Sequence, residues 1–76
     1  MVTVRRRYKG VQIEVIVSVV HRYWWCEDVR VCHDPHQTPI SLPVRGTFAD
    51  VIAAVAAGEA RAKDWIDGHG ATSEDH

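Results

Sequence analysis

Residues 8–20 read YKGVQIEVIVSVV, and this stretch decides the fold class of the chain. Within it, β-branched residues recur at every second position: Val11, Ile13, Val15, Val17 and Val19. That period is typical of a β-strand with one apolar face. The opposite parity starts polar, with Gln12 and Glu14, and becomes apolar toward Val20. We therefore expect a strand with its odd-numbered side chains in a core.

A second strand is predicted over residues 23–33, which read YWWCEDVRVCH. In this strand Tyr23 and Trp25 share the core parity with Val29 and Val31, and we expect Trp24 and Cys26 on the opposite face. His21 and Arg22 separate the two strands without Gly, Pro or Asn, so this turn is the least defined boundary. A slip in register there would exchange the two faces.

The remaining elements are a third strand and a helix. Two prolines indicate a loop over residues 34–39, and Pro43 makes residues 40–45 a short edge strand. An alanine-rich helix is expected over residues 48–66, with Thr47 as its N-cap and Gly68 at its end. Gly58 falls in the apolar stripe of this helix, which indicates a close approach to the sheet or to another helix.

These elements predict an α+β fold, a three-stranded antiparallel β-meander with one C-terminal α-helix packed on one face. The 76 residues are enough for one core, so we expect a single domain over residues 1–69 and a disordered acidic tail over residues 70–76.

Charge and hydrophobicity limit the partners of the chain. The net charge is −1, so the composition favours neither a nucleic acid nor an anionic membrane. A local basic cluster at Arg5, Arg6, Arg7 and Lys9 indicates either a solvated terminus or an arm for phosphates. No segment has the pattern of a secretion signal or of a membrane span, so we expect a cytoplasmic protein without membrane contact.

Cysteine and histidine residues are candidate zinc ligands. Cys26 and Cys32 are six residues apart on one predicted strand, or roughly 20 Å, so they can neither share an ion nor form a disulfide. A fold-back of the following loop would bring Cys32 together with His33 and His36, giving three ligands at most. The sequence therefore predicts free cysteines, no metal and no cofactor. It also contains no catalytic motif, so we expect a protein that is not an enzyme.

Two groups of proteins share short motifs with this chain. Tyr8-Lys9-Gly10-Val11, followed by Gly46-Thr47-Phe48 before an alanine-rich helix, resembles the plant ethylene-response-type DNA-binding domain. That resemblance implies three strands and a helix, with arginines and tryptophans of the open sheet face reading bases. Tyr8-Lys9-Gly10 with Trp65-Ile66-Asp67 is also similar to small uncharacterised bacterial domains, which implies a bacterial source and no particular activity.

Two functions follow as hypotheses. The favoured one is a non-catalytic protein-interaction module, a homodimer formed through an apolar patch of Ile16, Val20 and Trp24 on the open sheet face. The alternative is a nucleic-acid-binding domain that uses the basic N-terminal cluster, with Trp24 or Tyr23 as stacking platforms.

Overall fold

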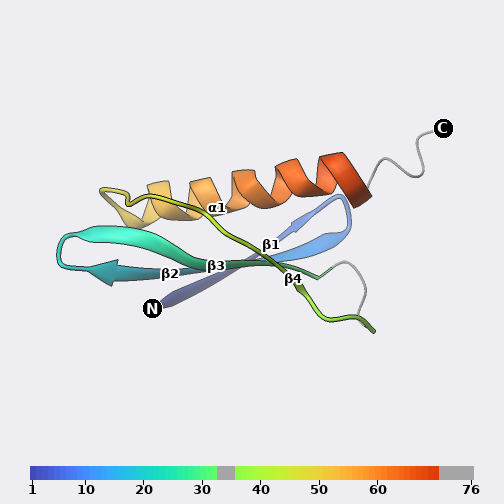
Figure 1. The fold of residues 1–76 in the computed structure, drawn as a ribbon, viewed down its shortest axis with the longest axis horizontal. Coiled ribbons are helices and arrows are strands. Elements are labelled where there is room, and N and C mark those ends of the chain that lie inside the picture. The colour runs from blue at the N-terminus through green and yellow to red at the C-terminus, as the bar shows by residue number, and fades with distance from the viewer. Residues whose placement is uncertain (33–35, 71–76) are drawn as a thin grey trace.

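The structure, a computed structural model, describes residues 1–32 and 36–70. An antiparallel sheet carries a long helix on one of its faces (Figure 1). The strands are β1 Val2–Tyr8, β2 Val11–Val20, β3 Tyr23–Cys32 and β4 Ile40–Leu42, and the helix is α1 Val51–Trp65. The strands lie in the order β1-β2-β3-β4. The predicted α+β class is confirmed, but the meander has four strands and not three.

The unpredicted strand is β1, which contains the arginine run. It pairs with β2 from Val2 opposite Val17 to Tyr8 opposite Val11. Lys9 and Gly10 join the two strands, and both have positive φ, 52° and 79°. Two such residues in succession form the tight turn whose twist matches a β-hairpin. We expected these arginines in a terminal segment before the first strand, but they belong to an edge strand, where charged residues are also common.

The β2–β3 hairpin contains an irregularity that changes which side chains face the core. Its turn lies at His21-Arg22, as predicted, and His21 has a φ of 58°. Ile16 pairs with Asp28, but its neighbour Val17 pairs with Cys26. Glu27 is therefore an extra residue in β3, which makes a β-bulge. Beyond a bulge, the alternation of side chains between the two faces is reversed.

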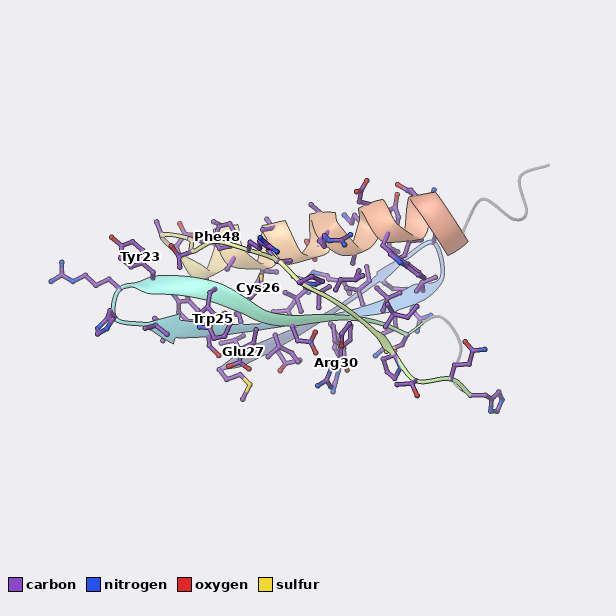
Figure 2. All side chains as sticks on the ribbon, in the orientation of Figure 1. Tyr23, Trp25, Cys26, Glu27, Arg30 and Phe48 are labelled. Carbon is purple, nitrogen blue, oxygen red and sulfur yellow. The ribbon has the colours of Figure 1, made fainter. Side chains whose placement is uncertain are left out.

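This reversal corrects the faces predicted for β3. Cys26 is buried beneath α1 and Trp24 packs against the core, although both were expected on the open face. Trp25 and Glu27 instead point away from the helix, as does Arg30 (Figure 2). The prediction assumed a regular strand, and no local signal in residues 23–33 excludes one.

The segment before α1 also differs from the prediction. The third predicted strand is shorter than expected, as β4, although it does lie at an edge of the sheet. Phe48 is extended and exchanges two backbone hydrogen bonds with Trp24, of 2.7 and 2.8 Å. The helix therefore begins later, and Asp50 is its N-cap in place of Thr47. The Asp50 side chain accepts a hydrogen bond of 2.7 Å from the backbone N–H of Ala53.

Small residues bring α1 close to the sheet. Ala54, Gly58 and Ala62 lie one turn apart on the buried side of the helix. A β-carbon placed on Gly58 would lie 2.5 Å from Cγ1 of Val15 on β2. The predicted close approach of the helix to the sheet is thereby confirmed. The core around this contact is aliphatic: Ile13, Val15, Val17, Val29, Val31, Leu42 and Ile66.

The C-terminal end of the helix is tied to the first hairpin. After Trp65 the chain continues into one π-helical turn, Ile66–Gly70, so Gly68 does not end the helix as predicted. The Asp67 carboxylate accepts hydrogen bonds of 3.1 Å from the Tyr8 hydroxyl and of 2.7 Å from Lys9 Nζ. Most of the predicted acidic tail, residues 71–76, lies outside the described residues.

Candidate interaction surfaces

The three residues predicted to form an apolar interface do not form one surface. Ile16 is only 9% exposed, because Thr3 and Asp28 flank it on the adjacent strands. Trp24 lies on the helix side of the sheet, as a result of the bulge. Val20 alone is exposed, near the end of the β2–β3 hairpin.

A different set of apolar side chains is exposed at that end of the hairpin. We refer to Val19, Val20, Tyr23 and Trp25 together as the hairpin tip. Each is between 37% and 56% exposed. Val19 pairs with Trp24 and so belongs to the helix side, whereas Val20 and Trp25 share the open-face register of Ser18. The tip lacks cover because β1 begins opposite Val17 and therefore pairs with none of residues 18–20. Four large exposed apolar side chains within seven residues are unusual for a surface without a partner.

The rest of the open face carries balanced charge. The Arg5 guanidinium pairs with Glu14 at 3.0 Å, and that of Arg30 pairs with Asp28 at 3.1 Å. Ser18 donates a hydrogen bond from its hydroxyl to Glu27. Within strands β1, β2 and β3, which the structure describes, the arginines of this face are Arg5, Arg7 and Arg30, and the acids are Glu14, Glu27 and Asp28. Three charges of each sign give no positive field for a polyanion.

An apolar groove follows the helix side of β1. Its volume is about 390 Å³, and it lies between β1 and the first half of α1. The groove exists because α1 packs mainly over β2 and β3 and leaves β1 largely uncovered. Its lining residues are Val2, Val4, Arg6, Val51, Ile52, Val55, Ala56 and Glu59. The ion pair between Arg6 and Glu59, 2.7 Å long, closes one end of the apolar lining.

The four basic residues predicted as a nucleic-acid site are divided by the structure. Arg5, Arg6 and Arg7, with Gln12, line a shallow hollow of about 270 Å³ at the edge of β1. Lys9 lies beyond them in the turn and forms an ion pair of 2.7 Å with Asp67. This pair lowers the pKa of the Asp67 carboxyl, chiefly through the hydrogen bond from Lys9.

The two cysteines lie on opposite faces of the sheet. Cys26 faces α1 and donates a hydrogen bond of 3.1 Å from its thiol to the carbonyl of Ala54. Burial raises the pKa of this thiol, more than its hydrogen bond with the Gly58 backbone lowers it. Cys32 pairs with Gln12 and is half-buried on the open face. Both are free thiols.

The described residues contain no group of three His, Cys, Asp or Glu side chains able to hold a metal ion. His33, one of the three ligands considered from the sequence, lies outside the described residues. Over residues 1–32 and 36–70, no helix is long and apolar enough to cross a bilayer.

Comparison with known proteins identifies no relative: the chain matches no protein-family model, no curated protein and no solved structure. The resemblances inferred from short motifs therefore stay predictions. The candidate surfaces rest on the geometry of this chain alone.

Two features of these surfaces were missed from the sequence. The alternation of Val2 and Val4 before the Lys9-Gly10 turn is a signal for β1, and with it for the groove. The exposure of Trp25 had no such signal, because it depends on the bulge at Glu27.

Proposed function

We propose that this domain is a non-catalytic protein-interaction module that self-associates through the hairpin tip. The observation that carries this proposal is the exposure of Val19, Val20, Tyr23 and Trp25 together at one end of the molecule. Two copies that pack tip against tip would remove the same apolar side chains of both chains from water.

The dimensions of the tip predict a weak association. Stable protein interfaces bury about 1,200–2,000 Å² in total, and four partly exposed side chains from each chain supply the lower end of that range or less. The contact should therefore be reversible, with a dissociation constant of the order of micromolar or weaker. Trp25 and Tyr23 are the expected anchors, since aromatic residues carry much of the binding energy at such interfaces.

The alternative function, nucleic-acid binding through the open face, gains one observation. The bulge places Trp25 on the same face as Arg5, Arg7 and Arg30, and an exposed aromatic ring is a platform for base stacking. Two of these arginines are engaged in ion pairs with Asp28 and Glu14, and the balanced charge of the face disfavours a phosphate backbone. Self-association is therefore the favoured function.

A dilution series followed by nuclear magnetic resonance tests the proposal residue by residue. If the tips pack together, the backbone amides of residues 19–25 and the indole N–H of Trp25 should shift as the concentration rises. The amides of Arg7 and Gln12, at the other end of the open face, serve as internal controls, and their chemical shifts should not change. Concentration-dependent shifts confined to β1 or to α1 would contradict the tip as the contact surface. Shifts at Trp25 on titration with a short single-stranded oligonucleotide would favour the alternative.

A further inference from the structure

The outer edge of β1 is an unused pairing site. β1 lies at the end of the strand order and pairs on one side only, with β2. Over the part of the chain that the structure describes, no other segment pairs with its outer edge. Alternate residues of an edge strand direct their N–H and C=O groups outward, where an added strand can bond to them. β1 has seven residues, whereas the opposite edge strand, β4, has three.

The groove lies directly beside this edge. Val2, Val4 and Arg6 line it from β1, and Val51, Ile52 and Val55 line it from α1. Ile52 is 78% exposed, so the apolar lining of the groove includes a large side chain that is open to solvent. A strand added to β1 would direct every second side chain to the helix side of the sheet, and so into this groove. The site would therefore select apolar residues at alternate positions.

The charge of this edge indicates which residues should alternate with the apolar ones in the added strand. Arg5, Arg6 and Arg7 line the hollow at the same edge. The side chains of Arg5 and Arg6 are more than half exposed, although they form ion pairs with Glu14 and Glu59. Guanidinium groups bind carboxylates with good geometry, so acidic residues in the added strand are complementary to this edge.

A second copy of β1 fits the edge poorly. Full antiparallel pairing of two β1 strands is centred on Arg5 and places it opposite Arg5 of the other copy. Arg7 of each copy then lies diagonally across from Arg5 of the other copy, on the same face of the sheet. Like charges directly opposite each other destabilise a strand pair. The arginine run thus disfavours self-pairing and favours an acidic partner.

We propose that the β1 edge binds an extended acidic peptide segment, with alternating apolar and acidic residues, as an added strand whose apolar side chains fill the groove beside α1. This site is separate from the hairpin tip and does not depend on self-association. Arg5 and Arg7 select the acidic residues on the open face, and Val2, Val4 and Ile52 select the apolar ones.

Three synthetic peptides test this inference on the full chain. The first probe is the capped peptide Val-Glu-Val-Glu-Val-Glu-Val, which matches the seven residues of β1 and places its glutamates on the open face, opposite Arg7, Arg5 and Thr3. The second has lysine in place of each glutamate, and the third has proline in place of the valine at its third position. Binding is measured by fluorescence anisotropy at two salt concentrations, and the contact is mapped by amide shifts.

The acidic peptide should bind about tenfold more tightly than the lysine peptide, because a few exposed charge pairs supply a factor of that size. Its binding should weaken as salt rises, and the shifts should follow residues 2–8. The proline peptide should bind much less, because proline lacks an N–H and cannot continue the ladder. Ile52→Lys and Arg7→Gln should each weaken binding, and Val20→Lys at the hairpin tip should not.

Equal binding of the acidic and lysine peptides would overturn the inference, and so would full binding of the proline peptide. Loss of binding with Val20→Lys would do the same, because it would place the peptide at the hairpin tip. A failure to bind any of the three peptides also overturns it, and leaves the proposed self-association unaffected.

Discussion

Gly58 of α1 lies so close to Val15 of β2 that a β-carbon on the glycine would be 2.5 Å from the valine Cγ1. Both residues are buried, and Val15 is a short branched side chain with little rotational freedom. The glycine therefore sets the distance between the helix and the sheet, and Cys26 and Ala54 can reach hydrogen-bonding distance beside it.

Gly58→Ala should destabilise the protein. Overpacking of a dense core costs about 1–3 kcal/mol, and the better helix propensity of alanine offsets roughly 1 kcal/mol of this. Urea denaturation measures the change in the free energy of unfolding. Gly68→Ala is the matched control, because nothing lies within 4 Å of a β-carbon there. If both variants were equally stable, the helix would not lie as close to the sheet as described.

The β-bulge at Glu27 predicts different reactivity of the two thiols. Cys26 is buried beneath α1, and the raised pKa of its thiol keeps it protonated, so a disulfide reagent should modify it slowly. Cys32, half-buried on the open face, should react first. A reaction time course of the Cys26→Ala and Cys32→Ala variants assigns the two rates, and both thiols should react equally in denaturant. Without the bulge the two cysteines would share one face, and similar rates in the folded protein would indicate that arrangement.

The contact of Asp67 with Tyr8 and Lys9 predicts a loss of stability in acid. The pKa of the Asp67 carboxyl is lower in the folded chain than in the unfolded chain, mainly because Lys9 donates to it. The contribution of the Asp67 carboxylate to the free energy of unfolding is therefore present at neutral pH and is lost as the pH falls through the folded pKa. Asp67→Asn should reduce the difference in unfolding free energy between neutral pH and about pH 3.

Asp64→Asn removes a carboxylate from the end of α1, three residues before Asp67, and is the control for this measurement. It should leave the difference between neutral and acid stability close to that of the unchanged chain. An equal effect of the two substitutions would mean that Asp67 acts only through net charge.

The strand periodicity and the helix were predictable from the sequence because each depends on local chemistry. The valines and isoleucines of residues 11–20 repeat with the period of a strand, and Gly58 stands in the apolar stripe of the helix. We did not predict β1, because the run Arg5, Arg6 and Arg7 is equally typical of an edge strand and of a solvated terminus. The N-cap moved from Thr47 to Asp50 because Phe48 pairs with Trp24, a contact distant in sequence.

The candidate site was predicted less well than the fold. Val20 was placed correctly on an exposed surface, but Trp24 and Trp25 exchanged faces. A single extra residue at Glu27 causes this exchange, and neither hydrophobic pattern nor turn chemistry indicates it. The burial of Ile16 likewise follows from β1, whose presence places Thr3 beside it.

The groove beside β1 supplies a control residue for the test of self-association. Ile52 is the most exposed large aliphatic side chain on α1 and lies in the lining of that groove, not among the hairpin-tip residues. A change of Ile52 to lysine therefore matches a change of Val20 to lysine in chemistry, since each replaces an exposed aliphatic side chain by a charge, but it alters the other surface. The pair separates the two proposals within one assay.

Sedimentation equilibrium over a range of concentrations tests the proposed function most directly. The unchanged chain should show a reversible monomer–dimer equilibrium, with dimer populated at about 100 µM, as expected for a small interface. Val20→Lys should reduce the association at least about tenfold, because it places a charge in an apolar contact, and Ile52→Lys should leave it unchanged. A monomer at every concentration, or a dimer that survives Val20→Lys and dissociates with Ile52→Lys, would contradict self-association through the hairpin tip.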